Sequence, residues 1–101
     1  MFKAIILLKK KEDVTSEQFK DWWINSHSPK AAKLPNIRKL CFNLVENEGE
    51  KAFDGVAEQW FDGQEDFENA YASEIGQMVA RDSISNVLKR ERLFVKEHDI
   101  I

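Results

Sequence analysis

The stretch Phe2-Lys-Ala-Ile-Ile-Leu-Leu-Lys9 decides the fold of this 101-residue chain. Side chains alternate between the two faces of an extended strand, so Ala4 and Ile6 point one way and Ile5 and Leu7 the other. Both faces are therefore apolar in the middle of the strand. A sheet that helices cover on one side only would leave one of these faces in water. Either helices cover both faces, or a second chain covers the bare one.

Composition indicates one small globular domain over residues 1–101, because 43% of the residues are hydrophobic and 33% are charged. The net charge of −3 argues against a nucleic-acid partner, which usually meets a basic face. No run of 18 apolar residues is present, so we expect no membrane partner. The apolar run at the N-terminus is too short for a signal peptide. A cytoplasmic location is the resulting expectation.

The chain offers little to a metal or a cofactor. Its single cysteine, Cys41, cannot form an internal disulfide, and its two histidines lie far from it in sequence. No phosphate-binding loop or dinucleotide fingerprint occurs either. We therefore expect neither a metal nor a cofactor.

A long amphipathic helix is predicted after the first strand. The run Thr15-Ser-Glu-Gln18 is a capping box, in which side chain and backbone at both ends bond reciprocally. Apolar residues then recur at three-and-four spacing, and His27 falls on the same stripe as Trp23. Pro29 removes a backbone donor and disfavours a helical conformation before it, so we expect a break or kink near Ser26–Pro29, followed by one or two more turns.

The remaining elements complete an alternating order. After the first helix we expect a strand, a hairpin loop, a third strand, a second helix capped by Asp62 with Glu65, a further helical stretch, a weak break and a last strand. Val87 to Glu91 is ambiguous. The expected ranges are strands at 37–46, 53–62 and 92–98, a helical stretch at 74–81 and the break at 82–86.

The order strand, helix, strand, strand, helix, strand is that of the split βαβ, ferredoxin-like α+β plan. Right-handed crossovers place both helices on one face of a four-stranded antiparallel sheet. The other face, which carries Ile5 and Leu7, then stays bare, and a large apolar face is unusual on a monomer. We therefore expect a homodimer in which sheet packs on sheet.

Dispersed motifs resemble the EthD family over nearly the whole chain. They are Phe19-x-x-Trp-Trp-x-x-x-His-x-Pro29, Leu34-Pro35, Phe53-Asp-Gly-Val-Ala-Glu-x-Trp-Phe61 and Glu97-His98. The resemblance implies a single EthD-like domain of the dimeric α/β-barrel superfamily, whose ferredoxin-like protomers pair through their sheets. Superfamily members often act without a cofactor on small cyclic or aromatic molecules, in a pocket between the helices and the sheet. The family is generally grouped with oxidoreductases.

Three residues are candidates for catalysis. His27 could act as a general acid and base, since a reference pKa of about 6.5 suits proton transfer, or it could cap helix carbonyls instead. Glu58 interrupts a central strand, so it is either a carboxylate of raised pKa in the pocket or one half of a buried ion pair. Asp54 is either a turn residue before Gly55 or a site residue at its motif position.

Four further residues are candidates for contacting a substrate. Trp23, Trp60 and Tyr71 are aromatic rings that either fill the core or wall a pocket for a flat hydrophobic molecule. His98 lies in the terminal motif, and its neighbours Glu97 and Asp99 favour surface exposure.

Three functions remain open at this point. The first is a cofactor-independent enzyme that isomerises, dehydrates or oxygenates a small hydrophobic aromatic or lactone-like compound, with His27 moving the proton. The second is a non-catalytic ligand-binding or accessory protein of a degradation pathway. The third and weakest is a haem-binding barrel protein with His27 as axial ligand.

Overall fold

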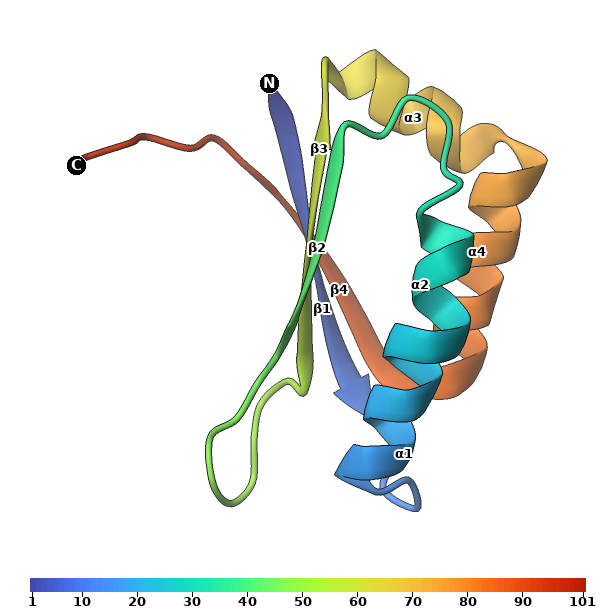
Figure 1. The fold of residues 1–101 in the computed structure, drawn as a ribbon, viewed down its shortest axis with the longest axis vertical. Helices are drawn as coiled ribbons and strands as arrows, with labels where there is room; N and C mark the ends of the chain where they lie inside the picture. The colour runs from blue at the N-terminus through green and yellow to red at the C-terminus, as the bar shows by residue number, and fades with distance from the viewer.

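Four strands form one antiparallel sheet in the order β2-β3-β1-β4 (Figure 1). The computed structural model describes all residues 1–101. With two central strands and two antiparallel edges, the sheet has the expected ferredoxin-like topology. The strands are β1 (Phe2–Lys10), β2 (Lys39–Leu44), β3 (Gly55–Phe61) and β4 (Val87–Val95).

All helices lie on one face of this sheet, and Figure 1 shows the opposite face bare. The first helix begins at the predicted capping box, in which the Thr15 hydroxyl accepts from the Gln18 N–H at 3.1 Å. None of the helices combines the length and the apolar character needed to cross a membrane. In chain order they are α1 (Ser16–Lys20), η1 (Asp21–His27), α2 (Ser28–Ala31), α3 (Gln64–Ala72) and α4 (Glu74–Asn86).

The helix does not break before Pro29, because α1, η1 and α2 are continuous, and the expected disturbance is a change of helix type instead. The segment η1 winds as a wider π-helix, in which the Ser28 N–H bonds to the Trp23 carbonyl five residues back. Proline cannot donate to the Ile24 carbonyl in that register, and the Ser28 hydroxyl donates to it instead at 2.6 Å. The wider turn thus accommodates the ring that would clash in an α-helix.

Asp62 does not cap the second helix as predicted. Its carboxylate pairs with Arg38, whose Nη2 lies 2.7 Å from Oδ2, and Gly63 occupies the N-cap position of α3. The predicted cap is therefore wrong, because the Asp62 side chain pairs with Arg38 instead of with the backbone of α3.

The weak break predicted at Asp82–Asn86 is also absent, and α4 continues to Asn86 before β4 starts directly at Val87. The predicted last strand therefore begins too late. Polar residues within this last turn are satisfied internally, since the Asn86 amide donates to the Asp82 carbonyl at 2.8 Å. Sequence periodicity is weak there because the buried stripe of the helix becomes polar.

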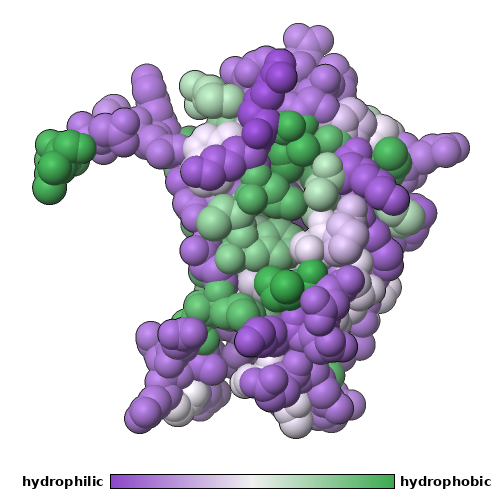
Figure 2. Space-filling view, viewed as in Figure 1, coloured by the Kyte–Doolittle hydropathy of each residue, from purple (hydrophilic) through white to green (hydrophobic).

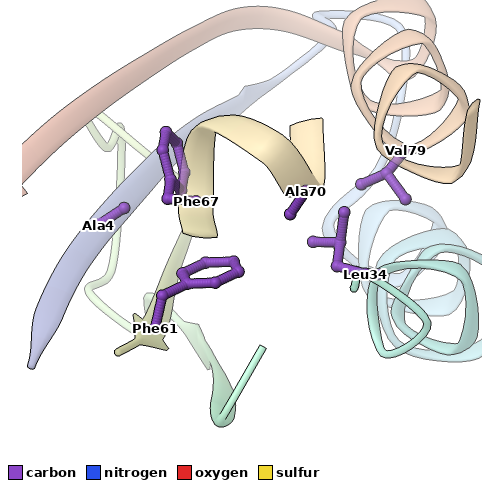
Figure 3. Packing of buried hydrophobic residues seen from close by; sticks show 7 residues of the cluster. Ala4, Leu34, Phe61, Phe67, Ala70 and Val79 are labelled. Carbon is purple, nitrogen blue, oxygen red and sulfur yellow. The ribbon is translucent and has the colours of Figure 1, made fainter. Parts of the chain in front are cut away.

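The core lies between the sheet and the helices, and strand alternation places it as predicted. Ala4, Ile6 and Leu8 of β1 are all buried on the helix side. One hydrophobic cluster forms around Phe61 and Phe67 (Figure 3), and a second one forms around Trp23. Phe42 of β2 packs against both.

Gly55 begins β3 and lets Trp23 pack flat against the sheet. A Cβ atom at this position would lie 2.8 Å from the Trp23 ring and 3.1 Å from Phe19. The Asp54-Gly55 pair is therefore not part of a tight turn, and its glycine provides space for an aromatic side chain.

The bare face of the sheet is less uniformly apolar than expected. Ile5 and Leu7 lie at its centre with Val56 and with Leu93, which is 46% exposed. Charged residues share the face, as the Lys3–Glu58 ion pair at 2.7 Å shows. The chain after β4 extends from the sheet on this same side (Figure 1).

Candidate functional site

A small, partly open cavity lies between the helices and the sheet, where the two hydrophobic clusters meet. Its walls are mainly apolar, from residues such as Leu8, Trp23 and Phe42. The cavity volume that is open to the centre of a water molecule is about 10 Å³, so the cavity holds about one water molecule. Five polar side chains converge on it: His27, Gln59, Tyr71, Ser83 and Arg90.

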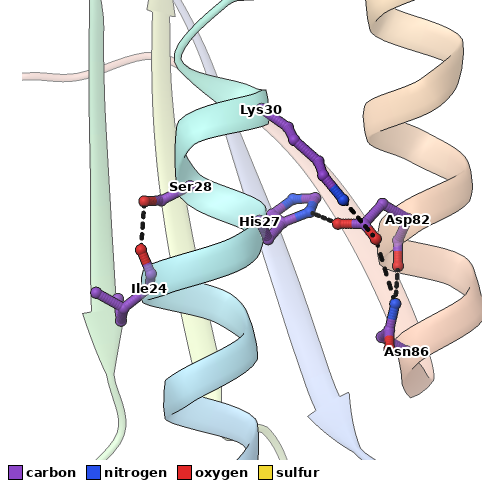
Figure 4. A network of polar contacts seen from close by, with 6 residues as sticks. All are labelled: Ile24, His27, Ser28, Lys30, Asp82 and Asn86. Carbon is purple, nitrogen blue, oxygen red and sulfur yellow. Dashed lines mark hydrogen bonds and ion pairs between the residues drawn. The ribbon is translucent and has the colours of Figure 1, made fainter.

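His27 projects from the first helix toward α4 and meets Asp82 there (Figure 4). Nδ1 of the imidazole lies 2.7 Å from Oδ2 of the carboxylate, and the histidine is only 5% exposed. Lys30 adds a second contact at 3.4 Å to the other oxygen of Asp82. The π-helical turn that absorbs Pro29 ends at His27, so the local geometry of the chain also sets the position of this side chain.

The charges of this pair follow from burial and from the pair's own contacts. Burial lowers the pKa of His27, and Lys30 and Arg90 act in the same direction, against the opposing effect of Asp82. Burial disfavours ionisation of Asp82, but the hydrogen bond from His27 and the charge of Lys30 outweigh it and lower the pKa of the carboxyl. At neutral pH the pair is therefore a neutral imidazole beside a carboxylate.

This charge state fixes the tautomer of His27. A carboxylate accepts only, so Nδ1 carries the proton and donates to Asp82, which leaves Nε2 with a lone pair. The hydrogen bond of the ring runs through Nδ1, and no hydrogen bond within the protein involves Nε2. The ring is held between Trp22 and Phe42, with centroid distances of 5.0 and 6.1 Å. A fixed imidazole with a free acceptor nitrogen is the arrangement of a general base.

A second polar group faces the same cavity from the sheet and from α3. The Gln59 amide nitrogen donates to the Tyr71 hydroxyl at 2.7 Å. Burial raises the pKa of Tyr71, so the phenol is neutral and its own proton is available to another acceptor. Arg90 lies next to it on β4, where its backbone pairs with Leu8 on the helix side of the sheet.

The structure brings three of the predicted site residues together, since His27, Trp23 and Tyr71 all line this cavity. It separates Glu58 and Trp60 from them, because strand alternation puts both on the bare face. The hydrogen bond from Lys3 lowers the pKa of Glu58, with a further contribution from Asn43, so the expected raised pKa is wrong. Glu58 forms the ion pair that was the alternative interpretation.

Asp54 and His98 also lie away from the cavity. Asp54 is buried at the start of β3, where its carboxylate accepts from the Lys10 backbone N–H at 2.9 Å and lies 3.8 Å from the Lys9 ammonium. These contacts hold neighbouring strand ends together, and Asp54 also lines a separate surface pocket of about 180 Å³. His98 is exposed beyond the end of β4, as its charged neighbours suggested.

Four polar residues of the cavity region were missed from sequence: Asp82, Gln59, Ser83 and Arg90. Asp82 follows the buried Val79 by three positions, so extending the helix past Arg81 would have placed it beside the buried stripe of α4. Gln59 carries a weak signal, as a polar residue inside a predicted central strand. Nothing local marks Arg90, since it lies in a run of charged residues at 89–92. No three His, Cys, Asp or Glu side chains gather anywhere in the chain as a metal site would require.

Sheet order and a one-sided helical layer define this chain as a ferredoxin-like α+β protein. It belongs to the EthD family, because the family model for the EthD domain matches residues 11–87. None of the curated proteins compared with the chain matches it.

Solved structures share the fold at low sequence identity. An ethyl tert-butyl ether d (EthD) family protein from Bacillus halodurans is 20% identical, with a TM-score of 0.82 over 97% of this chain and 100% of its own. A dimeric ferredoxin-like protein of unknown function from Bacteroides fragilis is 23% identical, with a TM-score of 0.74 over 95% of each chain. SnoaB, a cofactor-independent oxygenase from Streptomyces nogalater, is 13% identical, with a TM-score of 0.73 over 99% of this chain and 95% of its own.

Proposed function

We propose that this protein is a cofactor-independent enzyme that removes a proton from a small hydrophobic, aromatic or lactone-like compound, with His27 as the general base. The observation that carries the proposal is the His27–Asp82 pair at 2.7 Å. The carboxylate keeps the proton on Nδ1 and stabilises the imidazolium that forms when Nε2 accepts a second proton. Membership of the EthD family also supports a role in the conversion of a small molecule.

Proton removal is a first step that several reactions share. When Nε2 takes a proton from carbon next to a carbonyl, the electron pair of that bond moves into an enolate. Return of the proton to another atom isomerises the compound, loss of hydroxide dehydrates it, and attack of the carbanion on dioxygen oxygenates it. All three reactions use the same base, so this site supports proton transfer as their common step. The structure of the bound compound decides which of the three products forms.

A ligand needs the cavity to widen. Phe42 lines the cavity and also an apolar groove of about 290 Å³ formed with Ile24, Ala32 and Leu40 at the edge of the sheet. Figure 2 shows hydrophobic side chains gathered along this hollow between β2 and the helices. In our proposal the ligand enters from the groove, and Phe42 moves aside to connect the two spaces.

Binding without catalysis is the second candidate, and the tightness of the cavity favours it. A site with room for about one water could hold ligand only in an opened state and orient it through His27 without reaction. Haem ligation is a poorer fit to the same observation, since a macrocycle exceeds this space many times.

We also propose that the protein works as a homodimer joined through the bare sheet faces. Burial of Leu93, Ile5 and Val56 against a partner would remove exposed apolar surface from water. The exposed residues Ile100 and Ile101, which follow the sheet on that side, could then reach the partner chain. The dimeric description of the Bacteroides fragilis protein supports this assembly.

A binding screen followed by an exchange assay tests the catalytic proposal. Aromatic and lactone compounds that raise the melting temperature are incubated with the protein in D₂O, without added cofactor, and their C–H signals are followed by NMR. We expect exchange or turnover with the native protein, and a loss of about 10²- to 10⁴-fold in the His27→Gln variant with binding retained. Binding without exchange or turnover, or turnover that survives this substitution, would reject His27 as the base.

A further inference from the structure

Arg90 is a cation inside the cavity wall that no carboxylate neutralises. Its side chain is half-buried on the helix side of β4, and its Nε has no hydrogen-bond partner. No ion pair of the chain includes Arg90. A buried donor without a hydrogen-bond partner is costly, so the orphaned Nε calls for a physical explanation.

The charged groups around Arg90 do not supply the missing partner. Asp82, the carboxylate beside the cavity's histidine, is already engaged by His27 and Lys30. Arg92 follows on the same strand face and adds a second positive charge. Burial lowers the pKa of Arg90 and Arg92 acts in the same direction, while Tyr71 opposes them. The electrostatic field at this end of the cavity therefore favours a negative charge.

Gln59 adds an unused acceptor to the same wall. It is only 3% exposed, and although its amide nitrogen donates to Tyr71, its Oε1 has no partner. Tyr71 has its own proton left to donate. The cavity thus presents one free acceptor at Gln59 and free donors at Tyr71 and Arg90, which is a pattern that a hydroxylated, acidic molecule would complete.

We propose that the ligand of this cavity is a small apolar compound with an acidic oxygen, a phenolate, enolate or carboxylate, which binds Arg90 and Tyr71 while a neighbouring hydroxyl donates to Gln59. This inference rests on the proposed function in that both assign the ligand to the His27 cavity. It adds the charge of the ligand and the residue that selects it. An oxygen that gains negative charge when His27 removes a proton would meet the same cation.

The probe for this proposal is 4-nitrophenol, because its ionised form is yellow and its neutral form is not. At a pH somewhat below the pKa of the free phenol, binding beside Arg90 should shift the spectrum toward the phenolate. We expect Arg90→Gln to weaken phenolate binding by roughly tenfold to a hundredfold, the ratio that corresponds to a lost charge-assisted hydrogen bond. Arg90→Lys keeps the charge and should retain part of the shift.

Matched controls separate charge from packing. The neutral ether 4-nitroanisole should bind the native protein and Arg90→Gln equally well. The ligand-free Arg90→Met variant should melt no lower than the native protein, since it removes a half-buried charge that has no counter-ion. Replacement of an arginine with a purely structural role would instead lower the melting temperature. This second measurement also decides the matter if Arg90→Gln folds poorly.

The outcomes distinguish this inference from the proposed function. A colour shift that persists in His27→Gln and disappears in Arg90→Gln supports Arg90 as the anion site, even where no substrate turns over. The inference is overturned by phenol that stays neutral when bound, by equal shifts with and without Arg90, or by failure of the phenol to bind up to its solubility limit. A shift that disappears only in His27→Gln overturns it as well, because His27 would then be the group that takes the proton.

Discussion

Nδ1 of His27 lies 2.7 Å from Oδ2 of Asp82, although the two residues are 55 positions apart in sequence. This contact joins the π-helical turn before Pro29 to the penultimate turn of α4 (Figure 4). Because the carboxylate fixes which nitrogen holds the proton, a structural tie between two helices also sets the chemistry of the imidazole.

Asp82→Asn should allow His27 to populate both of its neutral tautomers. An amide can donate to Nδ1 as well as accept from it, so the proton is no longer confined to one nitrogen. We expect ¹⁵N NMR of the native protein at neutral pH to report an Nδ1–H imidazole, and the variant to report a mixture. A native protein in the Nε2–H form would contradict the assignment. Asn86→Ala, which removes a weaker contact of Asp82, is the control and should leave the tautomer unchanged.

Stability should decrease as the pH falls below the ordinary pKa of histidine, 6.5. The pKa of His27 is lowered in the folded state, so in this pH range the unfolded chain binds a proton at His27 and the folded chain does not. The contribution is fully present above 6.5 and is lost progressively down to the folded pKa. Each unit of lowering corresponds to about 1.4 kcal/mol.

Chemical denaturation at several pH values measures this effect, with His27→Gln as the reference. The free energy of unfolding of the native protein should change more steeply with pH than that of the variant between 6.5 and the onset of carboxylate titration. Asp82 acts in a separate window, because its lowered pKa stabilises the fold above its ordinary value of 3.8 and this contribution is lost as the pH falls through the folded value. Parallel pH profiles above that window would show that burial of His27 carries no such linkage.

Gly55→Ala should destabilise the fold by about 1–3 kcal/mol, the usual range for an overpacked core. The added methyl would meet the Trp23 ring at 2.8 Å and push it toward the cavity. Urea denaturation measures the loss. The same substitution in a Trp23→Phe background should cost less, since the smaller ring leaves room for the methyl. Additive losses in the double variant would mean that the two positions do not meet.

Leu93→Glu should convert a dimer to monomers. The substitution places a charge at an exposed apolar position on the bare sheet face, where a partner sheet would bury it without compensation. Sedimentation velocity at micromolar concentration compares it with Ile84→Glu, which alters a more exposed apolar residue on α4 in the helical layer. A native protein that sediments as a monomer refutes the assembly, and dissociation by both variants would place the contact elsewhere.

The element order, the capping box and the split of β1 into two faces could all be predicted from sequence. Each of these features depends on periodicity or on neighbouring residues, and no long-range contact in the fold overrides that local preference. The end of α4 could not be predicted. Asp82 and Asn86 look like helix-ending residues from sequence. The polarity of Asp82 is compensated by His27, far away in the chain, and that of Asn86 by the Asp82 carbonyl one turn back.

The amino-acid sequence by itself determined a ferredoxin-like protomer, a helix with His27 on its inner stripe, and the rings of Trp23 and Tyr71 beside it. Only the tertiary structure decided which polar group His27 meets, because Glu58 and Asp82 are both plausible partners until the strand faces and the length of α4 are fixed. Alternation turned Glu58 to the bare face, and the extra turn of α4 brought Asp82 to Nδ1. Periodicity assigns each residue to a face, but long-range packing alone decides what that face contacts.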